Sequence, residues 1–142
     1  MTVASIYRNP LDNQLAVQMK CMKLYAHALH AVNPKSRLTA NVPKVLKSRI
    51  ESTAFNAVNC VNAANKQRLD DQAERICRRE LQAKAKALLN EHQTALTALH
   101  AYKRLPARKL AYWMKLIEES EAILKRWVDS DAKRIEKNDF AG

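Results

Sequence analysis

The most regular hydrophobic pattern of this chain lies between Leu105 and Ser130. Apolar or small residues recur there at intervals of three and four, at Leu110, Trp113, Ile117, Ser120, Leu124 and Trp127. Such spacing places one stripe along a helix that packs against another helix. Pro106 suits the first helical turn, where its missing amide has no helical partner in any case. The segment therefore predicts a helix over 106–138 that forms one wall of a bundle.

Three earlier segments also have helical periodicity, at about 12–32, 42–65 and 70–104. The expected N-caps are Asp12 for the first helix, Asn41 for the second and Asp70 or Asp71 for the third, because their short side chains accept from free amides. Asn33-Pro34 ends the first helix, since proline cannot continue it. Together with 106–138, these segments predict four helices joined by short connections.

Each of the three earlier helices has a predicted buried stripe. In the first it is Leu15, Met19, Met22, Tyr25 or Ala26, Leu29 and Val32; in the second Leu46, Ile50, Ala54 or Thr53, Ala57, Val61 and Ala64; in the third Cys77, Leu81, Lys84, Leu88, Ala95, Leu99 and Tyr102. Lys84 interrupts the third stripe. The asparagines at 56, 59, 62 and 65 lie beside the second stripe and are expected to face water rather than a second subunit.

Composition supports a single all-α domain. The chain has 142 residues and one glycine, Gly142, so little turn chemistry is present for β-hairpins. Short connections favour an antiparallel up-down-up-down bundle over 12–138, with an arm at 1–11 and a tail at 139–142. No apolar run is long enough for a membrane span, and the first twenty residues lack the apolar segment of a signal peptide. With three cysteines and no zinc-ligand spacing, we expect a cytoplasmic protein whose thiols are reduced and mostly buried.

Basic residues exceed acidic ones by eleven, which favours an anionic partner such as nucleic acid. In an up-down bundle the first and third connections meet at one end. They bring there Lys35, Arg37, Lys44, Lys47, Lys103, Arg104, Arg108 and Lys109, the predicted binding residues. Secondary basic candidates on the flanks are Lys20, Lys23, Arg75, Arg78 and Arg79. An acidic protein partner would fit the same charge.

Two sequence motifs of the chain are similar to those of a known family. One comprises Leu105, Pro106, Arg108, Glu119, Leu124, Trp127 and Val128. The other comprises Pro34, Lys35 and Ser36, then Leu46, Arg49, Ile50 and Glu51. With these motifs the chain resembles the accessory variability determinant (Avd) family of diversity-generating retroelements, within a broader group that includes proteins encoded in ribosomal intervening sequences. The chain departs from the family pattern at Lys125 and Arg126, at Lys47 in place of a glycine, and in extra residues around 40–45.

The resemblance implies a four-helix bundle assembled into a pentameric barrel that binds its reverse transcriptase and nucleic acid. The corresponding function is non-catalytic support of mutagenic reverse transcription, through contacts to template RNA or cDNA. Two alternatives stay open: a generic RNA-binding bundle of the ribosomal intervening-sequence type, and an assembly module for an acidic protein. Apolar residues outside the stripes also favour an oligomer, namely Val58, Cys60, Met114, Leu116 and Ile123.

No catalytic or metal-binding pattern is evident, so a non-enzyme without a cofactor is expected. His27, His30, His92 and His100 lie toward the basic end and are expected in polar surface or capping roles. Trp113 and Trp127 fall on the helix stripe and are expected in the core or a subunit interface. Tyr112 falls off that stripe beside Lys109 and is the better candidate for stacking on bases.

Overall fold

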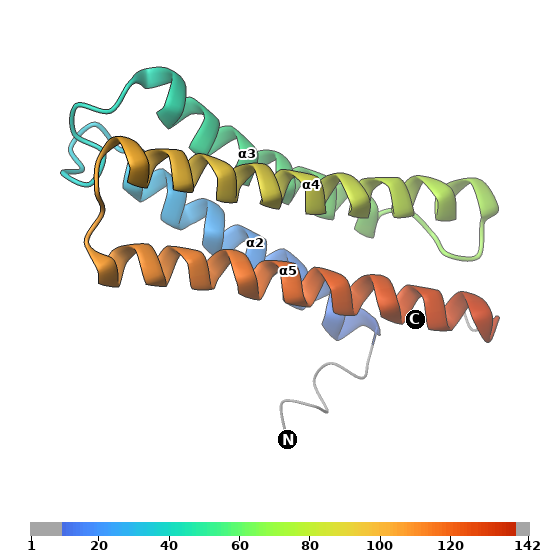
Figure 1. The fold of residues 1–142 in the computed structure, drawn as a ribbon. Helices are drawn as coiled ribbons and strands as arrows, with labels where there is room; N and C mark the ends of the chain where they lie inside the picture. The colour runs from blue at the N-terminus through green and yellow to red at the C-terminus, as the bar shows by residue number, and fades with distance from the viewer. Residues whose placement is uncertain (1–9, 139–142) are drawn as a thin grey trace.

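The computed structural model describes residues 10–138, with side chains from residue 13 onward, and contains four helices in this range. They are α2 (Pro10–Val32), α3 (Lys44–Asn65), α4 (Gln72–Tyr102) and α5 (Ala107–Glu136). Figure 1 shows them packed lengthwise as a four-helix bundle, with no strand in the described part. The all-α prediction is confirmed. Residues 10 and 11, predicted as part of the arm, belong to α2. Residues 1–9 of the predicted arm and the tail at 139–142 lie outside the described residues.

The helix ends differ from the predicted ones where proline is involved. Pro10 begins α2, so Asp12 lies within its first turn and is not the cap. The N-cap of α3 is Pro43, and Asn41 lies two residues earlier with φ 64°, so the predicted Asn41 cap is wrong. Asp71 does cap α4, since its carboxylate accepts from the Glu74 amide at 2.9 Å.

The stripe predicted for the last helix forms the centre of the core. Trp113, Ile117, Ser120, Leu124 and Trp127 are all buried, and Leu110 packs against them half-buried. The α3 stripe from Ile50 to Ala64 is buried as predicted. Of the asparagines beside this stripe, those at 56 and 59 are exposed as predicted, whereas those at 62 and 65 are half-buried.

The complete burial of Trp113 and Trp127 makes both tryptophans core residues rather than exposed stacking platforms.

The stripe predicted for the first helix is largely wrong, since only Tyr25 and Val32 of its residues pack, half-buried, against the core. Leu15, Met19, Met22 and Leu29 are exposed, and the buried face of α2 consists instead of Asn13, Val17, Cys21, Leu24, Ala28 and Ala31. Both sets repeat at helical intervals, and the smaller residues Cys21 and Ala28 let α2 approach its neighbours closely. Periodicity alone did not reveal which of the two apolar faces would pack inward.

The N-terminal half of α4 is also turned relative to its predicted stripe. Arg78, Gln82 and Ala85 are buried there, whereas Cys77 and Leu81 of the predicted stripe are half-buried and Lys84 is exposed. In the C-terminal half the predicted Leu88, Ala95 and Leu99 are buried, and only Tyr102 is exposed. Polar residues in the core hid this face from a search for apolar periodicity.

The apolar residues taken as a sign of oligomerisation are largely covered within the chain. Val58, Cys60, Leu116 and Ile123 are buried and Met114 is half-buried. These five residues therefore give no support for an oligomer. The longest row of exposed apolar residues lies on α2, whereas Val45 and Phe55 of α3 and Ile76 of α4 are exposed singly.

Candidate nucleic-acid interface

The first and third connections lie together at one end of the bundle (Figure 1). Lys103 joins them directly, because its Nζ donates to the Arg37 carbonyl at 2.6 Å and to the Ala40 carbonyl at 3.2 Å. Residues more than sixty positions apart thus form one surface, which we call the basic end. It comprises residues 33–50 and 100–112.

The α2–α3 connection is held by its own hydrogen bonds. The buried Thr39 hydroxyl donates to the Ala31 carbonyl at 2.6 Å, and the Asn33 side chain accepts from the Lys35 amide at 2.9 Å. Val42 is buried as well and anchors the connection in the core. These contacts fix the backbone, so the exposed side chains of Lys35 and Arg37 extend from a defined position.

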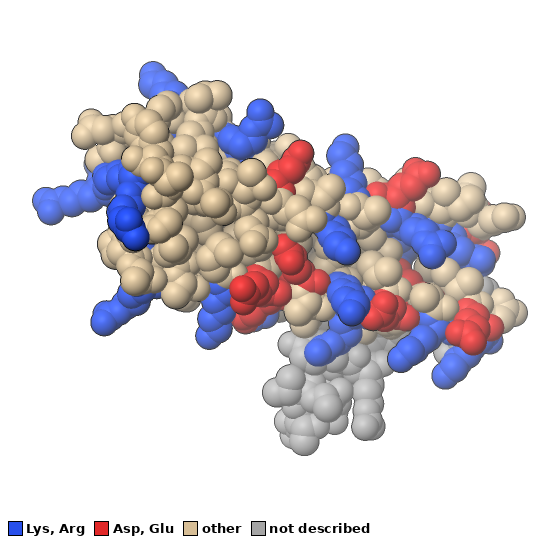
Figure 2. Space-filling view, in the orientation of Figure 1, with Lys and Arg blue, Asp and Glu red and all other residues tan. Residues whose placement is uncertain are grey.

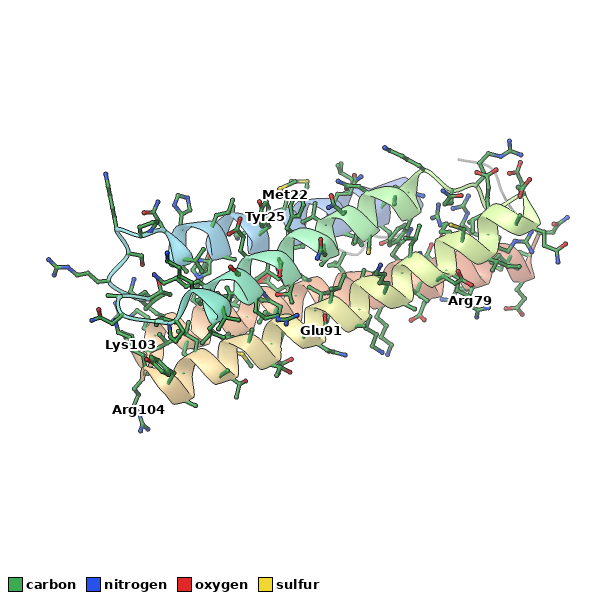
Figure 3. All side chains as sticks on the ribbon, turned by 90° about the horizontal axis from the view of Figure 1, so that it is seen from above. Met22, Tyr25, Arg79, Glu91, Lys103 and Arg104 are labelled. Atoms are coloured by element: carbon green, nitrogen blue, oxygen red, sulfur yellow. The ribbon has the colours of Figure 1, made fainter. Side chains whose placement is uncertain are left out.

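The α4–α5 connection is a tight turn. The Lys103 amide donates to the Leu99 carbonyl at 2.8 Å, and the Leu105 amide donates to His100 Nδ1 at 3.1 Å. Buried Leu105 anchors the turn. Figure 3 shows Lys103 and Arg104 at this end, with Arg104 pointing away from the helices. His100 thus closes the turn through its side chain, while the C-cap of α4 is Lys103.

Two helix N-termini open onto the basic end without a side-chain cap. Pro43 precedes α3 and Pro106 precedes α5, and neither helix has a side-chain cap hydrogen bond or an acidic residue in its first turn. A helix N-terminus carries a partial positive charge and free amide donors, which favour anions. By contrast, α4 begins at the opposite end with Asp71 and Glu74. The sequence signal, proline after an apolar residue, was visible but was interpreted only as a helix start.

Charge is divided unequally along the bundle. The two segments 13–50 and 92–117 contain twelve Lys and Arg residues and no Asp or Glu. The remainder of the chain has 13 basic and 14 acidic residues, so the whole positive excess comes from these two segments. On the face drawn in Figure 2, Lys and Arg project from the basic end among uncharged residues, and Asp and Glu appear only farther along the helices.

The structure brings the eight predicted binding residues to this end with different exposures. Lys35, Arg37, Lys44, Arg104, Arg108 and Lys109 are exposed, while Lys47 and Lys103 are half-buried. Because Lys103 Nζ already donates to two carbonyls, its first role is to hold the two connections together. The other residues present their charge to solvent.

The secondary basic candidates do not form a second patch. Arg78 is 3 % exposed and makes a two-bond ion pair with Asp131, Nε to Oδ2 at 2.7 Å and Nη2 to Oδ1 at 2.8 Å. Lys20 pairs with Glu119 at 2.7 Å, and Arg75 Nε donates to the Leu69 carbonyl. Lys23 and Arg79 are exposed on different helices. Arg78 is therefore a core residue and leaves the set of binding candidates.

His92 is also a core residue, contrary to the surface or capping role predicted for the histidines. It is fully buried between Trp113 and Thr53 and hydrogen-bonds to both. Burial lowers the pKa of His92 to about 4. Burial also lowers the pKa of His27, with smaller effects from Lys109 and His30. Both rings are therefore neutral at pH 7 and add no charge to the basic end.

Tyr112 and Tyr102 are the exposed aromatic residues of the basic end. Tyr112 is 45 % exposed, lies three residues after Lys109 and meets the His27 ring edge-on at 5.3 Å. Tyr102 is 61 % exposed and directly precedes Lys103 and Arg104. Exposed rings among cations suit stacking on unpaired bases.

Within residues 13–138, no group of three or more His, Cys, Asp or Glu side chains is placed to hold a metal ion. Cys21 and Cys60 are buried free thiols, and burial raises the pKa of Cys21 to about 12. None of the described helices is long and apolar enough to cross a membrane. Comparisons with protein-family models, curated proteins and solved structures find no match.

Proposed function

We propose that this protein binds nucleic acid at its basic end. The observation that carries the proposal is the surface where two uncapped helix N-termini meet a carboxylate-free set of lysines and arginines. Their like charges repel, so folding alone gives no reason to gather them. Phosphates spanning both connections relieve that repulsion. Contacts of this kind are made to the backbone and are therefore nearly independent of sequence.

We further propose the biological setting that the sequence resemblance implies. The protein would be a non-catalytic accessory subunit of a diversity-generating retroelement, binding its reverse transcriptase and its template RNA or cDNA. The antiparallel up-down-up-down arrangement and assembly into a pentameric ring belong to the same proposal. The placement of the connections supports the arrangement, and the exposed apolar face of α2 supports an assembly.

The test reverses the charge of two exposed residues, Arg104→Glu with Arg108→Glu. Binding to a labelled RNA and to a DNA strand is measured against salt concentration. Each phosphate contact contributes about 0.7 to 0.9 to the slope of log affinity against log salt. The double variant should bind more weakly and with a flatter slope, while its circular dichroism stays unchanged because neither side chain is in the core.

The matched control is Lys133→Glu with Lys137→Glu, two exposed lysines near the other end of α5. It changes the net charge of the protein by the same amount, so the effect of charge at the basic end is separated from the effect of net charge on affinity. Equal loss of affinity in both double variants would show that only net charge matters. Unchanged affinity and slope in the Arg104/Arg108 variant would remove the basic end as the binding surface.

A further inference from the structure

The outer face of α2 is apolar throughout its described length. Leu15, Met19, Met22 and Leu29 are 55 %, 64 %, 48 % and 39 % exposed, and they recur at helical intervals on the side opposite the core. Exposed Ala26 lies among them. We call these five residues the α2 ridge. A surface helix normally carries polar residues on this side, whereas a helix that is apolar on both faces is normally buried on both.

The α2 ridge is long enough to pack against another element. From Leu15 to Leu29 it extends about 21 Å at 1.5 Å per residue. The charged residues of this stretch, Lys20 and Lys23, lie off the ridge, and Lys20 pairs with Glu119 of α5. On the α3 side, Tyr25 meets the half-exposed Phe55 ring with centroids 5.3 Å apart, which widens the apolar surface.

The opposite face of the bundle contains a groove between α4 and α5. Its main hollow has a volume of about 610 Å³, with Ala83 and Ala122 among the lining residues and Leu124 and Val128 forming apolar walls. A second hollow of about 320 Å³ continues it toward Ile135 and shares Val128. Small side chains leave this space open, and α4 and α5 pack less closely than the other neighbouring helices.

The ridge and the groove match in length. Along α5 the lining runs from Glu118 to Ile135, about 26 Å at 1.5 Å per residue, against about 21 Å for the ridge. Glu118 and Glu121 stand at the groove, where Glu121 Oε1 is buried without a hydrogen-bond partner in the described structure. Arg79, Lys86 and Lys125 also line the groove, so its charge is mixed and the fit rests on the apolar walls and the matching length. Lys23, which borders the ridge, can supply a partner for the Glu121 carboxylate.

Figure 3 places Met22 and Tyr25 on the side formed by α2 and α3, and Arg79 on the side formed by α4 and α5. A ridge on one face cannot fill the groove on the other face of the same chain. We propose that the α2 ridge of one copy packs into the α4–α5 groove of a second copy. Such a contact is head-to-tail, so every copy keeps one free ridge or groove until a ring closes. The inference rests on the proposed assembly and specifies its interface.

The test uses one variant for each surface. Met19→Glu places a charge on the ridge and can pair with Lys23 one turn later, which protects the helix. Ala83→Glu fills the groove and can pair with Arg79 and Lys86 in the same way. Both positions are exposed, so folding should be retained. Sedimentation should show an oligomer for the unmodified chain and a 16.2 kDa monomer for each variant.

Mixing the two variants is the decisive step. In a head-to-tail interface, the Met19→Glu copy keeps an intact groove and the Ala83→Glu copy keeps an intact ridge. The mixture should therefore form a heterodimer and nothing larger. Ala98→Glu, a matched change at an exposed alanine of α4 outside the groove lining, should leave the oligomer intact. Met22→Glu and Ala122→Arg form a second pair should either first variant fail to fold.

Three results would overturn the inference. They are a monomeric unmodified chain at tens of micromolar, an oligomer that survives Ala83→Glu but not Met19→Glu, and a mixture that forms no heterodimer. The second would indicate ridge-to-ridge pairing. Nucleic-acid binding is scored separately, because Arg104→Glu with Arg108→Glu changes the basic end and neither of these surfaces. Failure of the interface therefore leaves the proposed nucleic-acid function standing, and the reverse also holds.

Discussion

The indole Nε1 of Trp113 donates a hydrogen bond to His92 Nε2 at 3.0 Å inside the core. Because an indole N–H is only a donor, Nε2 must be unprotonated and His92 must carry its proton on Nδ1. That nitrogen lies 2.9 Å from the Thr53 hydroxyl, which in turn donates to the Arg49 carbonyl at 2.8 Å. A neutral histidine therefore links α3, α4 and α5.

This link predicts a loss of stability in mild acid. The pKa of His92 is lowered from 6.5 to about 4, chiefly by burial, so the unfolded chain binds a proton between these values and the folded chain does not. Its stabilising contribution is complete above pH 6.5 and is lost as pH falls toward 4. At 1.36 kcal/mol per pKa unit the loss is about 3 kcal/mol. Urea unfolding at several pH values measures it.

The control for acid sensitivity is His92→Gln, which retains an acceptor for Trp113 but does not titrate. Its stability should depend less on pH between 6.5 and 4.5 than that of the unmodified chain. A residual slope is expected, since the pKa of His27 is lowered too. An unaltered slope in His92→Gln would assign the acid sensitivity to other groups.

The ion pair between Arg78 and Asp131 should be costly to break. Asp131 also accepts from Gln82 Nε2 at 2.8 Å, and Arg78 stacks over Trp127 with its guanidinium carbon 5.0 Å from the ring centroid. Asp131→Ala strands the buried Arg78 charge and should cost about 3–5 kcal/mol in chemical denaturation. Replacing both Arg78 and Asp131 by methionine should cost less, although the buried Arg134, with Nη1 4.0 Å from Asp131 Oδ1, then loses this ion pair. Asp129→Ala, at an exposed site on the same helix, is the matched control.

Trp127→Ala should also lower stability by about 3–5 kcal/mol, because the side chain is fully buried and its removal leaves a large cavity. Thermal or urea unfolding measures the change. Tyr102→Ala removes a ring that is 61 % exposed and should alter stability by less than about 0.5 kcal/mol. A near-normal Trp127→Ala protein would contradict the core position of this tryptophan.

Lys103 and Arg104 are adjacent but should respond differently to substitution. Lys103→Met removes two bonds to backbone carbonyls and should cost about 1 kcal/mol of stability as well as nucleic-acid affinity. Arg104→Met should reduce affinity alone, since that side chain is exposed. Denaturation and binding assays on both variants separate the roles. Equal stability of the two variants would show that the lysine bonds do not hold the connections together.

The sequence by itself determined the all-α class, the four helices and the charge of the basic end. A chain that has no internal glycine and has prolines at its connections favours long helices over strands and tight turns. The stripe of α5 could be predicted because its large apolar residues gather on one side of the helix, where Leu116 and Ile123 beside the stripe are buried as well. The basic end was readable because two carboxylate-free segments flank the connections that meet there.

Tertiary structure decided which face of α2 packs inward and which polar residues enter the core. Leu15, Met19 and Met22 have the same helical periodicity as Val17, Cys21 and Leu24, so a local pattern cannot rank them. Arg78 is 53 positions from Asp131, and His92 is 21 positions from Trp113. Burying a polar residue is costly unless a partner satisfies it, and for Arg78 and His92 that partner is supplied by a distant helix once the bundle has formed.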